Sequence, residues 1–316
     1  SMPDVKWFTG ATLNYAEHIF RQRNEDHPAL EFVHESGRHR TISWAGLEEQ
    51  VAKVRQFLVA QGIRKGDRIA GFLPNIPEAI IAFLATNSVG AIWSCCSPDF
   101  GERTVIDRFA QIEPKLLFTV DGYQYGGKNF ERHKQAMTIV STVTSIERVV
   151  LIPYLDAECN WPGKLITPWA ELMQQTLLAD LQFAPVPFDH PIWVLYSSGT
   201  TGKPKGVVRN HRAGALLSLV TEIELSLNRN DDALLVMPMC HANSLYFFGA
   251  FAYCGATTTV YSRKSFDPGH CLATLGSIGS TFTSLVPTHY IMMLAESSAR
   301  RGEHNLDRVT KLIEAM

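Results

Sequence analysis

Short apolar segments alternate with amphipathic stretches along most of the chain. Apolar runs typical of buried strands lie at 68–73, 91–95, 115–120, 148–152, 191–196, 233–237, 257–261 and 282–286. Between these runs we expect helices over 75–90, where Asn75 and Pro77 mark the start and Gly90 the end, from about 102 onward, over 213–225 and over 288–296. This alternation, with few hairpins, indicates an α/β protein in which right-handed crossovers join parallel strands and helices cover both faces of the sheets.

The first part of the chain adds a hairpin and a capped helix to this pattern. Residues 29–33 and 40–43 predict two strands around the turn Glu35-Ser36-Gly37. Ser43 is expected to cap the helix that follows, and Gly62 to end it.

Four further expectations concern loops and boundaries. Asp99 is expected to cap the helix that begins near 102, and the polar, glycine-containing stretch 124–128 to form a loop. Residues 306–315 are expected to lead into a further strand. The stretch 182–190 contains two prolines and is the best candidate boundary, so we divide the chain into a first α/β lobe, 1–187, and a second, 188–316.

The composition of the chain excludes some classes of binding partner. The chain has 316 residues, 46% of them hydrophobic and 19% charged, which is ordinary for a folded protein large enough for two lobes. Its net charge is -2, and it has no basic tract to hold a nucleic acid or an anionic membrane. The most apolar stretch, 79–96, is interrupted by Asn87, Ser88 and Gly90, so we expect a buried helix and strand there and no membrane span.

The 6 cysteines are scattered, without the C-x-x-C spacing of a zinc or redox site. We therefore expect buried thiols in a reducing compartment, and no metal site is assigned. The first residues, Ser1-Met2-Pro3-Asp4, do not resemble a signal peptide, which predicts a cytoplasmic location. The oligomeric state stays open, with a homo-oligomer among the alternatives.

The stretch from Tyr196 to Gly206, YSSGTTGKPKG, carries the most distinctive chemistry in the chain. Its glycines let backbone N–H groups approach an anion, its hydroxyls add donors, and its two lysines add positive charge. The spacing is not that of a Walker A loop. A flexible Gly/Ser hairpin between two strands is the alternative interpretation of the same residues.

The order of residues in this stretch resembles the phosphate-binding signature of the adenylate-forming enzymes, which include acyl-CoA synthetases, luciferases and peptide-synthetase adenylation domains. Two other stretches, WFTGATLNYAE at 7–17 and IWSCCSPDFG at 92–101 with DRF at 107–109, resemble short-chain acyl-CoA synthetases, most closely the acetoacetyl-CoA synthetase group. The resemblance covers essentially the whole chain but only the first part of the family's large N-terminal region. It implies two α/β lobes packed into a layered sandwich.

The resemblance also implies a ligase reaction in two halves. A carboxylic acid attacks the α-phosphate of ATP, giving acyl-AMP and pyrophosphate, and the thiol of CoA then takes the acyl group. The carboxylate and the α-phosphate are both anions, and negative charge builds on the departing pyrophosphate. Oriented N–H groups and a cation are the groups suited to stabilise this negative charge. ATP implies Mg²⁺, for which the sequence shows no evident ligand.

Site residues follow from the resemblance position by position. The phosphates of ATP are assigned to Ser197, Ser198, Gly199, Thr200, Thr201, Gly202 and Lys205, with Lys205 as the catalytic cation. Lys203 is expected to face solvent, because Pro204 fixes the turn between the two lysines.

The acid pocket is assigned to His241, Ala242 and Asn243, because His241 matches the histidine of the family's Pro-x-x-His turn. Without the resemblance, a histidine after an apolar strand is more often a packed, hydrogen-bonded residue. A general base is not needed, since a carboxylate is already ionised at neutral pH.

Several motifs of the family are missing from the sequence: Tyr-Gly-x-Thr-Glu, a later ribose-binding aspartate, the hinge, and the catalytic lysine of the mobile C-terminal domain. We therefore expect this chain alone to be inactive. Residues 237–251 also lack the tryptophan-rich sequence associated with acetyl- and acetoacetyl-CoA synthetases, so the acid could be acetoacetate or another short-chain acid. The alternatives are a luciferase-like or peptide-synthetase adenylation domain and a non-catalytic nucleotide-binding module.

Overall fold

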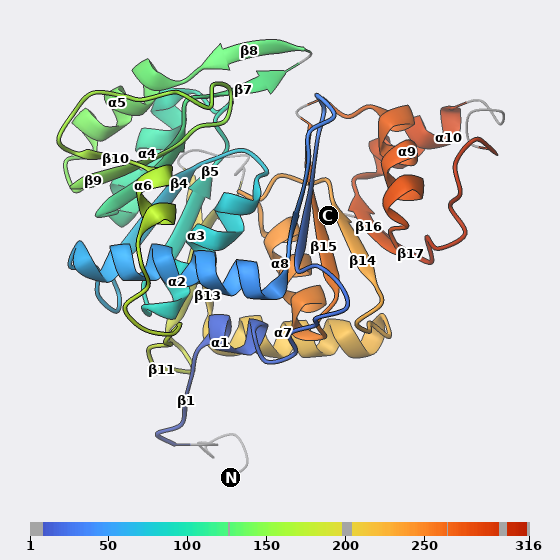
Figure 1. The fold of residues 1–316 in the computed structure, drawn as a ribbon, viewed down its shortest axis with the longest axis horizontal. Coiled ribbons are helices and arrows are strands. Elements are labelled where there is room, and N and C mark those ends of the chain that lie inside the picture. Colours follow the sequence, from blue (N-terminus) through green and yellow to red (C-terminus); the bar gives the residue numbers. More distant parts are fainter. Residues whose placement is uncertain (1–8, 126, 198–203, 264, 297–301, 315–316) are drawn as a thin grey trace.

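The computed structural model describes residues 9–125, 127–197, 204–263, 265–296 and 302–314 (Figure 1). They form an α/β fold with two large, mostly parallel sheets covered by helices, as the alternation in the sequence predicts.

The first large sheet has 7 strands in the order β10-β9-β6-β4-β5-β12-β13. Its strands are β4 (Arg68–Phe72), β5 (Ile92–Cys96), β6 (Leu116–Val120), β9 (Arg148–Ile152), β10 (Ile166–Pro168), β12 (Pro191–Ser197) and β13 (Lys205–Asn210). Neighbouring strands are parallel except for β12 and β13, which form an antiparallel hairpin at one edge.

The second large sheet has 6 strands in the order β17-β16-β14-β15-β2-β3. Its strands are β2 (Leu30–His34), β3 (His39–Ile42), β14 (Asp232–Leu235), β15 (Thr257–Ser262), β16 (Phe282–Leu285) and β17 (Lys311–Glu314). Only β2 and β3 are antiparallel to each other.

Two small antiparallel pairs complete the sheets. They are β1 (Thr12–Leu13) with β11 (Val186–Pro187), and β7 (Gly122–Tyr125) with β8 (Lys128–Glu131). The first pair ties the start of the described chain to the segment that precedes β12.

The helices lie in three layers around the two large sheets. They are α1 (Tyr15–Ile19), α2 (Trp44–Ala60), α3 (Pro77–Ser88), α4 (Glu102–Ile112), α5 (His133–Thr142), α6 (Trp169–Gln174), α7 (His211–Glu224), α8 (Ala242–Tyr253), α9 (Pro268–Ile278) and α10 (Pro287–Ala295). The largest apolar core joins α1, α2, α3 and α8 to both sheets, so these helices form the middle layer. Separate cores pack α4 and α5 on the outer face of the first sheet and α9 on the outer face of the second (Figure 1).

The local predictions for the first hairpin and its helix are confirmed. Strands β2 and β3 pair as predicted, and the hydroxyl of Ser43 accepts a hydrogen bond from the backbone N–H of Gly46 at 3.1 Å. Helix α2 ends just before Gly62, which has a φ of 77°, a conformation that favours glycine. Residues 311–314 form the further strand β17.

Two local predictions are wrong. Gly101, not Asp99, is the N-cap of α4, and it makes no side-chain capping bond. The carboxylate of Asp99 instead accepts a hydrogen bond from the Ser97 hydroxyl within the turn. The stretch 124–128 is not only a loop, because its ends belong to the β7–β8 hairpin, where the rings of Tyr123 and Phe130 stack at 5.2 Å.

Each large sheet takes strands from both sides of residue 187. The hairpin β2–β3 belongs to the second sheet although it lies near the start of the chain, and β12 and β13 belong to the first. The division into 1–187 and 188–316 therefore stays a prediction about domain organisation and does not describe the membership of the sheets.

Candidate functional site

The two ends of the glycine- and hydroxyl-rich loop lie opposite each other. In the antiparallel register of β12 and β13, Ser197 pairs with Lys205, and Tyr196 pairs with Gly206. Both Ser197 and Lys205 are exposed. Five predicted phosphate-binding residues (Ser198, Gly199, Thr200, Thr201 and Gly202) lie outside the described residues, as does Lys203, so those assignments stay predictions.

The strand that leads into this loop is anchored to α4 through Tyr196. Its hydroxyl donates a hydrogen bond to the main-chain oxygen of Arg108 at 2.6 Å. Burial raises the pKa of Tyr196 to about 12, so the phenol is neutral and keeps the proton that it donates. The other end of the loop is also tied to α4, because the side-chain amide of Gln111 donates to the main-chain oxygen of Pro204 at 3.3 Å.

Arg108 connects this strand to the turn that carries His241. Its guanidinium is buried and lies 4.6 Å from the ring centre of Phe100 and 5.7 Å from that of Tyr196, within cation–π range. The rings of Phe100 and His241 are 6.4 Å apart. A continuous set of ring contacts therefore joins the base of the phosphate-loop hairpin to the predicted acid-binding turn.

The three predicted acid-binding residues lie at the start of α8. His241 is the N-cap residue, and its backbone N–H donates to the main-chain oxygen of Pro238 at 3.0 Å. Ala242 is exposed, and the amide of Asn243 donates to the hydroxyl of Ser284 at 3.0 Å, which ties α8 to β16. The start of α8 is thus fixed beside the carboxyl ends of β14 and β16.

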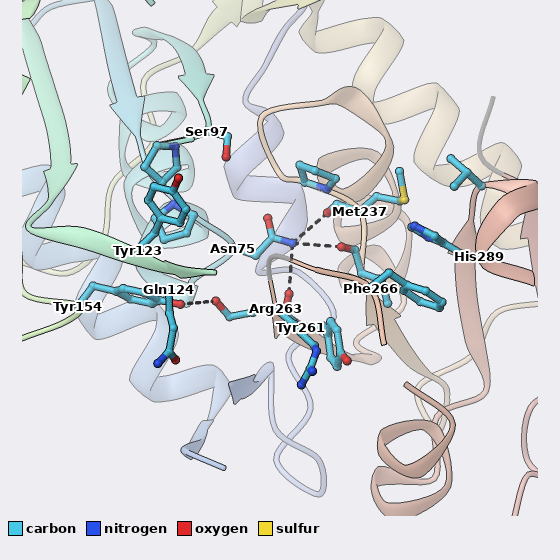
Figure 2. Close-up of a pocket in the computed structure, with 16 residues that line it drawn as sticks. Asn75, Ser97, Tyr123, Gln124, Tyr154, Met237, Tyr261, Arg263, Phe266 and His289 are labelled. Atoms are coloured by element: carbon cyan, nitrogen blue, oxygen red, sulfur yellow. Dashed lines mark hydrogen bonds between the residues drawn. The ribbon is translucent and has the colours of Figure 1, made fainter. Parts of the chain in front are cut away.

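A pocket of about 300 Å³ opens between the two large sheets (Figure 2). It lies where β4, β5, β14, β15 and β16 end, which is the edge at which open α/β sheets commonly bind ligands. Its lining combines tyrosines, a phenylalanine, methionine and prolines with a few polar groups, the mixture typical of small-molecule sites. The lining residues are Pro74, Asn75, Ser97, Pro98, Tyr123, Gln124, Tyr154, Val236, Met237, Pro238, Tyr261, Ser262, Arg263, Phe266, Val286 and His289.

Asn75 connects the two large sheets beside this pocket by hydrogen bonds (Figure 2). Its side-chain N–H groups donate to the main-chain oxygens of Met237 at 3.0 Å and Tyr261 at 3.3 Å. Its side-chain oxygen accepts from the backbone N–H of Met239 at 2.8 Å. One residue that follows β4 therefore holds the ends of β14 and β15 in the other sheet.

The polar side chains on the pocket wall are also held in place. The hydroxyls of Tyr154 and Ser262 are 2.8 Å apart, and Arg263 forms an ion pair with Asp267 at 2.9 Å. The ring of His289 stacks on Phe266 at 3.9 Å, and burial lowers the pKa of this histidine, so it is neutral at neutral pH. The wall is thus pre-organised, and Arg263 brings a positive charge to it.

The predicted acid-binding turn adjoins the pocket, but none of the described site residues that the sequence predicts lines it. Ser197, Lys205, His241, Ala242 and Asn243 are not among the lining residues, although the pocket shares the 236–241 segment with His241.

Sequence reasoning missed the roles of Asn75, Arg108 and Arg263. The signal for Asn75 was its position directly after a strand and before a helix-starting proline. A buried arginine on an amphipathic helix, such as Arg108, gives no local signal.

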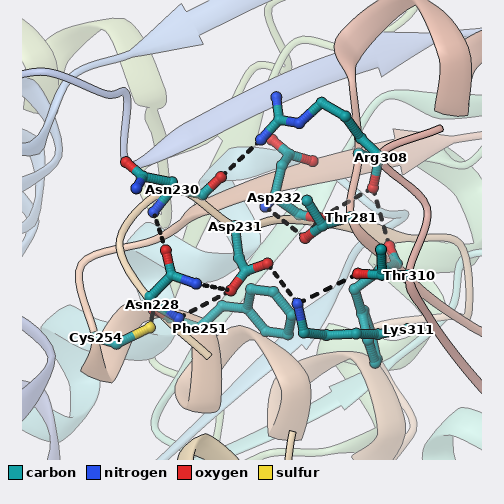
Figure 3. Close-up of polar contacts among 12 residues, drawn as sticks. Asn228, Asn230, Asp231, Asp232, Phe251, Cys254, Thr281, Arg308, Thr310 and Lys311 are labelled. Atoms are coloured by element: carbon teal, nitrogen blue, oxygen red, sulfur yellow. Dashed lines mark hydrogen bonds and ion pairs between the residues drawn. The ribbon is translucent and has the colours of Figure 1, made fainter. Parts of the chain in front are cut away.

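A second cluster of charged residues lies at the amino ends of the strands of the second sheet, away from the pocket (Figure 3). Lys311 pairs with the buried Asp231 at 2.7 Å. The neighbouring Asp232 is also buried, and its carboxylate accepts a hydrogen bond from the Thr259 hydroxyl at 3.1 Å. Burial raises the pKa of Asp232 to about 7, a larger effect than the opposing hydrogen bond to Thr259.

Within the described ranges, no three His, Cys, Asp or Glu side chains gather as a metal site. Five of the cysteines are buried thiols, as expected, and Cys159 is half-buried. No helix in the described part of the chain is long and apolar enough to cross a membrane.

The two helix-covered, mostly parallel sheets and the pocket at their strand ends define an α/β protein of the layered class. Residues 17–313 match the family described as AMP-binding enzyme. The chain therefore belongs to the AMP-binding, adenylate-forming enzyme family, as the resemblance in its sequence predicts.

Individual members of the family show how similar the chain is to proteins with a named activity. The chain is 40% identical over 222 residues to acetoacetyl-CoA synthetase of Mus musculus, covering 67% of this chain and 32% of that protein. It is 32% identical over 280 residues to malonamoyl-CoA synthetase of Penicillium aethiopicum, covering 84% and 38%. The solved acetoacetyl-CoA synthetase from Streptomyces lividans is 34% identical, with a TM-score of 0.89 over 99% of this chain and 48% of that one. The chain thus spans from 32% to 48% of the length of these relatives.

Proposed function

We propose that this chain is the N-terminal region of an ATP-dependent acyl-CoA synthetase. Such an enzyme activates a carboxylic acid as acyl-AMP and transfers the acyl group to CoA. Membership of the AMP-binding family supports the use of ATP, and relatives that carry the name CoA synthetase support the ligase reaction.

One observation carries the proposal in this chain: the pairing of Ser197 with Lys205. The pairing places a serine and a lysine opposite each other in the backbone register, at the two ends of a loop rich in glycine and hydroxyl residues. Lys205 supplies a positive charge for the phosphates of ATP, and the loop supplies N–H groups. Two residues of α4 hold the ends of the loop: Arg108 accepts a hydrogen bond from Tyr196, and Gln111 donates one to Pro204. The binding groups therefore need less ordering when ATP arrives.

The acid is proposed to be acetoacetate or another short-chain acid. Two named relatives act on different acids, acetoacetate and malonamate, according to their names, and this chain is 40% and 32% identical to them over the aligned parts. The turn at His241, Ala242 and Asn243 is proposed to contact the acid, and the adjoining pocket is wide enough for a small organic molecule. Mg²⁺ would enter with the phosphates of ATP, and CoA would enter as a co-substrate.

Binding of ATP to the purified chain, measured by titration calorimetry, tests the proposal. The variant Lys205→Ala is compared with Lys164→Ala, which removes a lysine just before β10, at the opposite edge of the same sheet from β13. We expect Lys205→Ala to weaken binding by about tenfold, the scale of one charge-assisted contact, and Lys164→Ala to have no effect. Equal affinities in the two variants, or no ATP binding by the wild-type chain, would contradict the proposal.

A further inference from the structure

Helix α7 has the reverse of the usual pattern of a surface helix. The side that faces the protein carries small or polar residues, namely His211, Gly214, Ser218 and Thr221. The side that faces solvent carries four large apolar residues: Leu216 (55% exposed), Leu219 (45%), Val220 (50%) and Ile223 (75%). Because these four follow an i, i+3, i+4, i+7 spacing, they form one stripe along the helix.

Close packing on the inner side fixes α7 in this rotation. A side chain at Gly214 would meet Ile192 at 2.9 Å and Tyr15 at 3.2 Å, and a side chain at Gly249 of α8 would lie 3.2 Å from the Ser218 hydroxyl. Leucines could not replace these small residues without displacing α1 and α8. The apolar stripe therefore faces outward because the inner side has no room for it.

The strand that precedes α7 extends this uncovered surface. In the part of the chain that the structure describes, β13 pairs with β12 alone and is an edge strand, and it contacts α7 directly. Val207 and Val208 are 53% and 59% exposed, although consecutive residues of a strand point to opposite faces. An uncovered edge strand next to an apolar helix is the kind of surface that proteins normally cover.

We propose that this surface, formed by α7 and β13, binds a second copy of the chain, with the two α7 helices antiparallel across a two-fold axis. The charges at the ends of the stripe favour this arrangement. Arg212 lies four residues before Leu216 on the same side, and Glu224 is the last residue of the helix. Both are exposed, and neither forms an ion pair with another described residue.

Antiparallel pairing brings Arg212 of each copy toward Glu224 of the other, whereas parallel pairing would bring like charges together. Antiparallel helix dipoles add to the preference. The helix has 14 residues and is about 21 Å long, which is short for a stable interface of about 800 Å² per partner. The exposed valines of β13 are therefore part of the contact. Dimerisation would then stabilise the β12–β13 hairpin that carries the phosphate loop.

Sedimentation velocity of the purified chain over a range of concentrations tests the inference, independently of the proposed function. We expect a wild-type dimer, and we expect Ile223→Glu to raise the dimer dissociation constant by at least about tenfold, because a charge would enter the apolar stripe that the two copies bury. Leu294→Glu is the matched control, since Leu294 is 68% exposed on α10, outside the proposed surface. Circular dichroism would show that both variants are folded.

A charge exchange tests the antiparallel geometry. Arg212→Glu should weaken the dimer, and combining it with Glu224→Arg should restore it. A monomeric wild-type chain, or an Ile223→Glu variant that dimerises as the wild type does, would overturn the inference. A dimer that is lost in Leu294→Glu and kept in Ile223→Glu would assign the contact to α10 instead.

Discussion

The hydroxyl of Tyr196 donates to the main-chain oxygen of Arg108 at 2.6 Å, while the guanidinium of Arg108 lies 5.7 Å from the centre of the same tyrosine ring. These contacts hold the end of β12, directly before the phosphate loop, against α4. Because Arg108 also lies over Phe100, the same residue connects the loop hairpin with the segment that faces His241.

Replacing Tyr196 with Phe should destabilise the chain by about 1 kcal/mol, the usual net value of one hydrogen bond. The ring and its packing remain, so the loss reports on the hydroxyl alone. Urea unfolding measures the change, with Tyr125→Phe as control because Tyr125 is 48% exposed on β7. Equal stabilities of the two variants would show that the Tyr196 hydroxyl does not anchor the strand.

Replacing Asn75 with Ala should cost about 2 kcal/mol or more, because backbone groups of Met237, Tyr261 and Met239 lose their partner at the junction of the sheets. Asn75→Asp is the informative companion, since it keeps the oxygen that accepts from Met239 and loses both donors. We expect its stability to fall between those of the wild type and Asn75→Ala. If both variants unfold at the wild-type urea concentration, the sheets are not joined by this residue.

The sequence predicts the alternation of strands and helices well because each element has its own apolar period. It does not predict that β2 joins β15, since Leu30 and Thr258 pair across more than two hundred residues and no local pattern specifies a partner. The hairpin β7–β8 was missed because its turn is polar and glycine-rich, like a loop. Arg108 was missed as a buried connector because a charged residue on an amphipathic helix is normally solvated.

The titration of Asp232 should lower the free energy of unfolding of the chain as the pH rises. Burial raises its pKa in the folded chain to about 7 from an ordinary value of 3.8. The folded state therefore holds a proton that the unfolded state releases between these values, so this contribution is complete below about pH 4 and is lost as the pH rises to about 7. The groups that face it are the Thr259 hydroxyl, Glu31, Arg308 and Ser280 (Figure 3 shows Arg308).

The variant Asp232→Asn removes this titration while keeping the shape of the side chain. We expect it to be more stable than the wild type at pH 8 and to lose the difference near pH 4. Thermal unfolding at both pH values measures the effect, with Asp156→Asn, on a loop away from the cluster, as control. A constant difference between Asp232→Asn and the wild type across this range would mean that Asp232 does not titrate with a raised pKa.

The purified chain should form no acyl-CoA from ATP, Mg²⁺, CoA and a panel of short acids. The sequence contains no Tyr-Gly-x-Thr-Glu motif and no counterpart of the catalytic lysine that the resemblance leads us to expect, and catalysis needs such groups to be held together with the loop. Chromatographic detection of acyl-CoA and AMP measures turnover. Sustained release of AMP that depends on CoA, from a preparation free of contaminating synthetase, would refute this expectation.

The central claim is that Lys205 and the loop between it and Ser197 stabilise the charge that develops when ATP reacts with a carboxylic acid. Acid-dependent exchange of pyrophosphate into ATP tests it most directly, in a protein that joins this chain to the motifs it lacks. We predict that Lys205→Ala lowers the exchange rate by about two orders of magnitude, the cost of one pre-organised stabilising group, while Lys164→Ala leaves it unchanged. Exchange by Lys205→Ala at nearly the wild-type rate would contradict the account.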